Sequence, residues 1–159
     1  MIVSNITLRD VIEDDLPVFF KHQQDRDANH MAAFTSEDPD DWNSFLTHWN
    51  KILTDKTIIK QTITVQNNVA GNILYFEQFG VPGVSYWIGR EYWGRGIATD
   101  ALREFLKLVT VRPLYARAVK DNIGSLKVLE KCGFAISGED SGFSNARGAD
   151  VEEFVFILE

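Results

Sequence analysis

Residues 89–99 read Gly89-Arg90-Glu91-Tyr92-Trp93-Gly94-Arg95-Gly96-Ile97-Ala98-Thr99. The stretch follows a predicted strand, residues 84–89, and opens a predicted helix, residues 97–109, whose apolar residues recur at the spacing of a core-facing side. Gly94 and Gly96 let the backbone approach a ligand with several N–H groups turned one way, and a helix start adds unpaired donors. Because such donors suit an anion, the stretch predicts a phosphate-binding turn, with Arg90 and Arg95 as cations nearby.

The spacing of the glycines separates this turn from two common nucleotide-binding fingerprints. The Rossmann pattern G-x-G-x-x-G needs a glycine where this chain has Thr99, and the P-loop pattern G-x-x-x-x-G-K-[ST] does not occur in the sequence. A Rossmann dehydrogenase and a P-loop phosphotransferase are therefore disfavoured. A plain glycine-rich turn with its arginines in solvent remains the simpler alternative at this point.

Hydrophobic periodicity on both sides of the turn predicts a mixed α/β (α+β) fold in a single domain, residues 1–159, with helices on both faces of the sheet. The pair Asp38-Pro39 is expected to cap a helix, and residues 80–83 are expected to break a strand. Residues 28–34, which show no cap, are expected to line a groove or form a packed connection, and residues 137–150 to form a polar hairpin tip. The expected elements are, in order, strand 6–9, helices 14–24 and 38–54, strands 57–65, 69–76 and 84–89, helix 97–109, strand 113–119, helix 122–132, and strands 134–136 and 151–158.

Composition limits the classes of partner. Sixteen Lys and Arg against 23 Asp and Glu give a formal net charge of −7, which argues against a nucleic-acid binder and mildly favours cationic substrates such as amines. The apolar runs are too short to span a membrane, and no secretory signal pattern opens the chain. One cysteine, Cys132, excludes an internal disulfide framework and suits a reducing compartment. The expectation is a cytoplasmic protein.

The reactive side chains show no spacing typical of a metal site or a covalent nucleophile. His22, His30 and His48 are scattered, so no metal is predicted. Cys132 stands at a predicted helix end with no evident histidine partner, which favours a buried filler over a nucleophile.

Two motifs carry a resemblance to a known family. Trp93-x-x-Gly96-x-Ala98 is similar to the [QR]-x-x-G-x-[GA] acetyl-CoA diphosphate loop of the GNAT N-acetyltransferase superfamily, with Trp in place of the usual first residue. Asn122-x-x-Ser125-x-x-x-Leu129-x-Lys131-x-Gly133-Phe134 resembles the second cofactor motif of the branch that contains ribosomal-protein N-acetyltransferases. The order of the remaining elements agrees with that fold, so the resemblance covers nearly the whole chain.

The resemblance implies a GNAT fold, with a mixed, mostly antiparallel sheet, and acetyl-CoA as co-substrate. It implies that residues 86–89 form a strand that splays from its neighbour, that the pantetheine arm lies along it, and that the Ile88 amide polarises the thioester carbonyl. The residues implied to bind the cofactor are Trp87, Ile88, Gly89, Arg90, Gly94, Arg95, Gly96, Ile97, Ala98, Thr99, Asn122 and Ser125.

The resemblance also bears on the leaving group. Many members place a tyrosine acid four residues after the position of Ser125, but this chain has Leu129 there, which cannot donate a proton. In the similar branch a serine approaches the CoA sulfur, so Ser125 is expected to support the departing thiolate, directly or through water.

No carboxylate stands in residues 84–89, where many members of the family carry a glutamate base. Glu77 is the nearest candidate in sequence, with Asp25 and His30 as remote ones, and a solvated surface position is the simpler interpretation for each. A lysine amine with a pKa of about 10.4 is neutral in roughly one molecule per few thousand at pH 7, whereas an α-amine has a pKa of about 7.7–8.0. A site without a strong base therefore favours an N-terminal amine or a small amine of low pKa.

The predicted function is acetyl transfer to a primary amine, of a peptide or of a small molecule, by direct attack. Two alternatives stay open: a catalytically weak acyl-CoA sensor or partner-binding module on the same fold, and an enzyme that places another phosphate-bearing cofactor in the same loop. The polar segment 137–150 is predicted to border the acceptor cleft or a homodimer contact.

Overall fold

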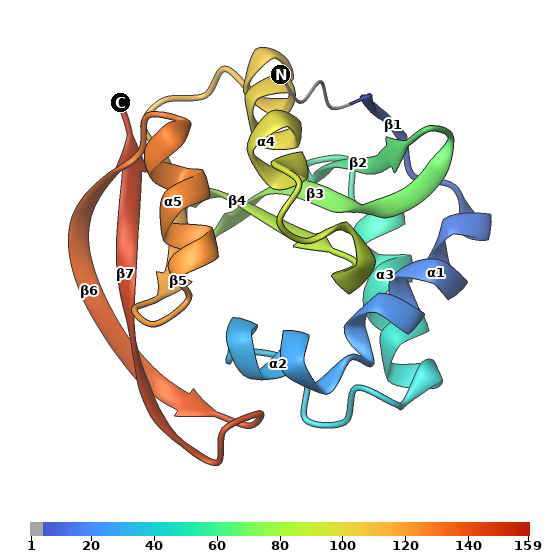
Figure 1. Cartoon of the computed structure of the whole chain (residues 1–159), viewed down its shortest axis with the longest axis horizontal. Helices are drawn as coiled ribbons and strands as arrows, with labels where there is room; N and C mark the ends of the chain where they lie inside the picture. The colour runs from blue at the N-terminus through green and yellow to red at the C-terminus, as the bar shows by residue number, and fades with distance from the viewer. Residues whose placement is uncertain (1–4) are drawn as a thin grey trace.

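The computed structural model describes residues 5–159, so residues 1–4 of the predicted domain lie outside the described part. Its strands form one sheet in the order β1-β2-β3-β4-β5-β7-β6, and the neighbouring strands are antiparallel except for the parallel pair β4 and β5 (Figure 1). The predicted mixed, mostly antiparallel sheet is therefore confirmed. The strands are β1 Ile6–Asp10, β2 Ile59–Val65, β3 Asn68–Gln78, β4 Val81–Ile88, β5 Leu114–Val119, β6 Ala135–Ser144 and β7 Ala149–Leu158.

Helices cover both faces of the sheet, as predicted. The side chains of Ile73 and Leu74 point to opposite faces because they are neighbours on one strand. Ile73 belongs to a buried cluster with α4 and α5, and Leu74 packs against a second cluster with α1 and α3. The helices are α1 Leu16–Gln23, α2 Arg26–Ala32, α3 Trp42–Thr54, α4 Ile97–Leu108 and α5 Ile123–Lys131. No helix among residues 5–159 is long and apolar enough to span a membrane.

The prediction for α4 is confirmed to within one residue. Ile97, Ala101, Leu102 and Phe105 are buried and face the sheet. Burial of this stripe fixes the direction of α4, and it thereby fixes where the first turn of the helix meets the end of β4.

The predicted break of the strand at 80–83 is confirmed at Gly80 but is wrong for residues 81–83. The chain turns at Phe79 and Gly80, both at positive φ, and β4 already begins at Val81. Pro82 lies inside the strand opposite Glu77. Backbone groups alternate along a strand, so position 82 turns its nitrogen away from β3, and the missing N–H costs no hydrogen bond to that neighbour.

The N-terminal helices also differ from the prediction. Asp41, rather than Asp38, caps α3, because its carboxylate accepts the Ser44 N–H at 3.1 Å. Most of α2 falls within the segment 28–34 predicted to lack a cap, but the helix begins earlier, at Arg26, and Asp25 caps its first turn through the Ala28 N–H at 3.1 Å. A helix of seven residues is too short to show a clear 3.6-residue period in the sequence.

The segment 137–150 is mostly strand rather than a hairpin tip. β6 continues to Ser144 and β7 begins at Ala149, which leaves a turn of four residues. Ion pairs across the strands hold these polar stretches: Arg117 of β5 pairs with Glu153 of β7 at 2.8 Å and with Asp140 of β6 at 2.7 Å. The polar composition that suggested a loop belongs to an exposed edge of the sheet.

Candidate functional site

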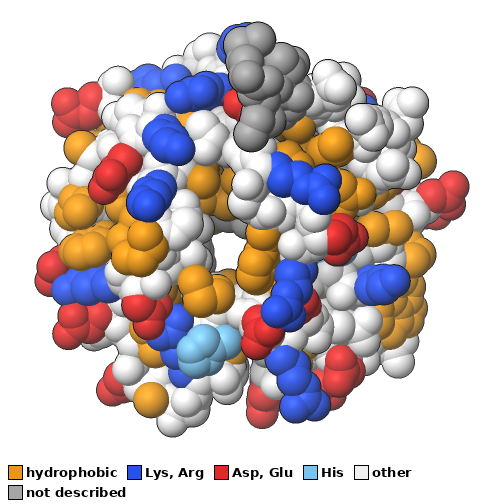
Figure 2. Space-filling view, in the orientation of Figure 1, with side chains coloured by type: hydrophobic (Ala, Val, Ile, Leu, Met, Phe, Trp, Pro, Cys, Tyr) orange, Lys and Arg blue, Asp and Glu red, His pale blue; other side chains and the backbone are white. Residues whose placement is uncertain are grey.

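The parallel strands β4 and β5 are joined at only one register position. Gly83 pairs with Tyr115, and no further pair follows toward the C-terminal end of β4. A cavity of about 580 Å³ lies where the strands diverge, with walls from α2, β4, the start of α4, β5 and α5. This face of the molecule is hollowed at its centre in Figure 2. The predicted site residues that line the cavity are Trp87, Ile88, Gly94, Gly96, Ile97, Ala98, Thr99, Asn122 and Ser125.

The edge of β4 that faces the cavity carries free backbone groups. Gly89, directly after β4, donates its N–H to the Ala70 carbonyl of β3 at 2.8 Å. Because N–H groups alternate in direction along a strand, the Ile88 and Tyr86 amides point to the opposite edge, where β5 has diverged. The strand therefore presents main-chain donors to whatever occupies the cavity.

The turn before α4 presents a second set of donors. Gly94 and Gly96 both have φ of +74°, and Gly96 stands at the N-cap of α4 without a side-chain cap. The first bond of the helix runs from the Asp100 N–H to the Gly96 carbonyl at 3.1 Å. Within residues 5–159, the N–H groups of 94–99 have no hydrogen-bond acceptor. This cluster of unpaired donors at a helix start suits a diphosphate.

The two arginines of the stretch do not line the cavity. The Arg90 guanidinium pairs with the carboxylates of Asp27 at 2.7 Å and Asp25 at 3.5 Å, at the start of α2. The Arg95 guanidinium lies 5.7 Å from the centre of the Tyr92 ring. The donors of the turn at residues 94–99 are therefore main-chain amides, and Arg90 links this turn to α2.

Trp93, the unusual first residue of the loop motif, is tied to the end of β4. Its indole Nε1–H donates to the Ile88 carbonyl at 2.9 Å, and the Arg90 guanidinium lies 6.0 Å from its ring centre. The indole thus ties the glycine-rich turn to the end of β4.

The N-terminus of α5 forms the opposite wall. The Asn122 side chain accepts the Ser125 N–H at 3.3 Å as a helix cap, and its amide donates to the Met31 carbonyl of α2 at 3.3 Å. Ser125 Oγ accepts a hydrogen bond from the Tyr86 hydroxyl at 3.1 Å. Leu129, one turn further along α5, is buried in the core.

Helix α2 is held beside the cavity by donors distant in sequence. Arg147 Nε donates to the His30 carbonyl at 2.8 Å, while its guanidinium forms a bidentate pair with Asp121 at 2.6 and 2.8 Å. Ser144 Oγ donates to the Ala33 carbonyl at 2.6 Å. These bonds satisfy carbonyls at the end of α2 and place Met31 and Ala32 in the cavity wall.

The candidate bases are not brought to this site. Glu77 lies on β3 opposite Pro82, six strand positions from Ile88, which corresponds to about 20 Å along the strand. Asp25 caps α2 and pairs with Arg90, and neither Asp25 nor His30 lines the cavity. Among the described residues that line the cavity there is no Asp or Glu.

Sequence reasoning missed one contact of the site and the helical form of one of its walls. The Tyr86 hydroxyl reaches Ser125, whereas the sequence placed Tyr86 only on the predicted strand. The wall formed by α2 was assigned to the correct segment, since Ala28 and Met31 line the cavity, but without its helix. Within residues 5–159 no three His, Cys, Asp or Glu side chains are grouped to hold a metal ion.

Comparisons with known proteins agree with this fold. A family model described as an acetyltransferase (GNAT) domain matches residues 5–135. An uncharacterized N-acetyltransferase p20 of Bacillus licheniformis is 25% identical over 105 residues, which are 64% of this chain and 58% of that protein, so the match spans a little over half of its length. The spermidine N-acetyltransferase from Vibrio cholerae in complex with CoA and spermine is 21% identical with a TM-score of 0.76, over 96% of this chain and 95% of that one. The ribosomal-protein-S5-alanine acetyltransferase from Vibrio fischeri is 20% identical with a TM-score of 0.71, over 98% and 94%.

Proposed function

Because the chain belongs to the family of GNAT acetyltransferase domains, we propose that it transfers an acetyl group from acetyl-CoA to a primary amine by direct attack of the amine on the thioester. The observation that carries the proposal is the pairing of two sets of free main-chain donors, on the edge of β4 and in residues 94–99, on the walls of one cavity.

The donors suggest how the co-substrate lies. The amides of residues 94–99 would hold the diphosphate, and the pantetheine arm would lie along Trp87 and Ile88 in the place of a missing strand. Gly89 and Arg90 already have partners in Ala70, Asp25 and Asp27, so we assign them to holding the loop rather than to direct contact.

The reaction would rest on positioning and on polarisation of the carbonyl. The Ile88 N–H, at the free edge, would donate to the carbonyl oxygen as negative charge develops there. As the C–N bond forms, the C–S bond breaks with its electron pair on sulfur, and the Ser125 hydroxyl would stabilise that thiolate. Water would take the proton that the amine loses and return one to the sulfur, so we assign no step to Glu77.

The cavity also bears on the class of amine. Its lining has no carboxylate to remove a proton from an ammonium ion or to pair with a polycation, so the amine has to arrive neutral. An α-amine, with a pKa of about 7.7–8.0, is readily deprotonated at pH 7. Deprotonating a lysine, whose pKa is about 10.4, costs roughly 4–5 kcal/mol at the same pH. We therefore propose a protein N-terminus or a small amine of low pKa as acceptor.

A CoA-release assay over a panel of amines tests this function. The panel holds peptides with a free N-terminus, the same peptides blocked at the N-terminus but carrying a lysine, polyamines and aminoglycosides. The expected result is CoA release with the peptides that have a free N-terminus or with weakly basic small amines, and little CoA release with the polyamines. Acetyl-CoA binding by calorimetry without release for any amine would instead support the acyl-CoA-binding module.

A further inference from the structure

The polar contact between Tyr86 and Ser125 crosses the cavity from β4 to α5. Tyr86 Oη and Ser125 Oγ are 3.1 Å apart, although 39 residues separate them in sequence. Both residues line the cavity, on the two elements between which the sheet opens. Their contact therefore joins the strand edge that would hold the thioester to the helix that would receive the leaving group.

The directions of the hydrogen bonds leave one hydrogen available. The Tyr86 hydroxyl donates to Ser125 Oγ, and the Ser125 main-chain N–H is occupied by the Asn122 cap. The Ser125 hydroxyl hydrogen is thus not needed for the contact with Tyr86, and it can rotate to an acceptor in the cavity. Because the tyrosine fixes the oxygen from one side, fewer directions remain for that hydrogen.

We propose that Tyr86 is a positioning residue for the leaving group: its hydroxyl fixes Ser125 Oγ so that the serine hydroxyl donates to the thioester sulfur as the C–S bond breaks. This inference rests on the proposed acetyl transfer. The chemistry needs no ionisation of either hydroxyl, because the electron pair of the broken bond stays on sulfur, the proton lost by the amine goes to water, and water supplies the proton of the thiol.

The surroundings of Tyr86 agree with a role as a neutral donor. Burial raises the pKa of Tyr86 to about 12, an effect that the hydrogen bond to Ser125 opposes and the neighbouring Cys132 strengthens. The phenol therefore stays protonated at the pH of the cell. A phenol of this pKa is a weaker acid than an ordinary thiol of about 8.5, so it would not serve well as the source of the proton itself.

Tyr86→Phe tests the role, because the ring and its packing remain while the hydroxyl is lost. The kcat for CoA release with the preferred amine should fall about tenfold, which corresponds to one hydrogen bond, with little change in the KM for acetyl-CoA. Ser125→Ala removes the same hydrogen bond from the helix side, and its kcat should fall at least as far. Because the tyrosine acts through the serine, Tyr86→Phe should cost nothing further in the Ser125→Ala background.

Tyr75→Phe is the matched control. Tyr75 is a buried tyrosine on β3, on the same face of the sheet as Tyr86, and its hydroxyl contacts Glu77 away from the cavity. It should match wild type in kcat, and its melting temperature reports the effect of losing a tyrosine hydroxyl that lies outside the cavity. A kcat of Tyr86→Phe equal to wild type, or losses that multiply in the double variant, would overturn the inference. An inactive wild type would overturn the proposed function itself, and this inference with it.

Discussion

At the scale of single residues, Gly96 and Gly80 provide a matched pair. Both have φ of +74°, and at both an added Cβ would meet no atom within 4 Å. Gly96 belongs to the proposed diphosphate turn, whereas Gly80 lies in the turn between β3 and β4. Alanine at either position is expected to cost about 1–2 kcal/mol of stability, because the left-handed region disfavours a residue with a Cβ.

Gly96→Ala should in addition weaken acetyl-CoA binding by about tenfold or more, because the turn would relax away from the conformation that directs its amides outward. Isothermal calorimetry on both variants measures this. Gly80→Ala should bind as wild type does. Equal affinities of the two variants for acetyl-CoA would show that this turn does not bind the diphosphate.

Gly89 is required for a different reason, namely space. An added Cβ would lie 2.5 Å from Nε2 of His22, whose ring is buried. Gly89→Ala is therefore expected to lower the free energy of unfolding by about 1–3 kcal/mol through overpacking, as measured by urea denaturation. Gly138→Ala on β6, where an added Cβ meets no atom within 4 Å, should be near neutral.

The double variant of Gly89→Ala with His22→Ala checks the cause of that loss. Because the second substitution removes the ring that the new methyl group meets, the double variant should lose less free energy of unfolding than the sum of the losses of the two single variants. Full additivity would show that the strain arises elsewhere than at His22.

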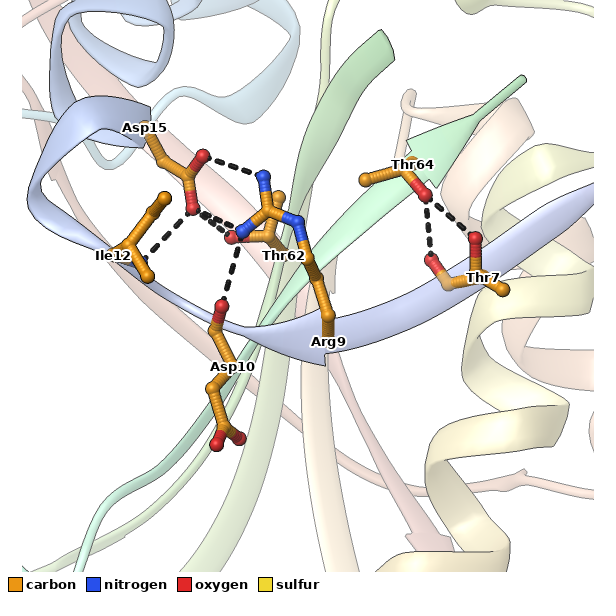
Figure 3. Close-up of polar contacts among 7 residues, drawn as sticks. All are labelled: Thr7, Arg9, Asp10, Ile12, Asp15, Thr62 and Thr64. Atoms are coloured by element: carbon orange, nitrogen blue, oxygen red, sulfur yellow. Dashed lines mark hydrogen bonds and ion pairs between the residues drawn. The ribbon is translucent and has the colours of Figure 1, made fainter. Parts of the chain in front are cut away.

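At the scale of elements, a buried carboxylate joins the first two strands to the turn before α1. Asp15, only 2% exposed, accepts two hydrogen bonds of 2.7 Å from Arg9 of β1, one of 2.7 Å from Thr62 of β2, and one of 3.0 Å from the Ile12 N–H (Figure 3). Burial alone would raise the pKa of Asp15, but the bonds from Arg9, Thr62 and Ile12 outweigh burial and hold the pKa below its ordinary value. The ionised form is thus the one that the fold selects.

The sign of the pH dependence follows from that shift. A carboxyl with a depressed pKa in the folded state stabilises the fold above its unfolded pKa of about 3.9, and the contribution is lost as the pH falls through the folded value. Asp15→Asn should therefore lower the free energy of unfolding by about 2 kcal/mol near pH 7, and the difference from wild type should narrow below about pH 4.

Urea unfolding of both proteins from neutral to acid pH measures this difference. Asp150→Asn, at an exposed carboxyl at the start of β7, is the control and should track wild type at every pH. If the difference in free energy of unfolding between Asp15→Asn and wild type stays constant into acid, the charge of Asp15 is not what its hydrogen-bond partners stabilise.

At the scale of the whole molecule, binding in the cavity should stabilise elements from both halves of the sheet at once. A ligand that binds only the folded state adds about 2.7 kcal/mol at a hundredfold excess over Kd, which for a chain of this size raises the melting temperature by about 5–10 °C. Acetyl-CoA is expected to produce this shift, whereas NAD and ATP at matched concentration should not. An equal shift with NAD or ATP would favour the alternative that another phosphate-bearing cofactor uses the loop.

Parts of the fold could be predicted because their cause is local. The stripe on α4, the cap of Asn122 on α5 and the stop at Gly133 each depend on residues within a few positions of one another. The choice between Asp38 and Asp41 as the cap of α3 could not be made in the same way, because both are suitable cap residues: Asp41 accepts the Ser44 N–H, whereas Asp38 accepts the Asp40 N–H in the turn before the helix. The extent of β6 depended on partners in β5 and β7, such as Arg117, that local composition does not reveal.

The same division applies to the site. The sequence by itself determined the glycine-rich turn before a helix and the resemblance to GNAT domains, since the glycines, the helix start and the second motif are contiguous patterns. Only the tertiary structure decided which of the remaining candidates meet: it joined Tyr86 to Ser125, drew Arg90 toward α2, and left Glu77 at the far end of its strand. The physical reason is that such contacts depend on the divergence of β4 from β5 and on strand register, which are properties of the packed sheet and not of any one segment.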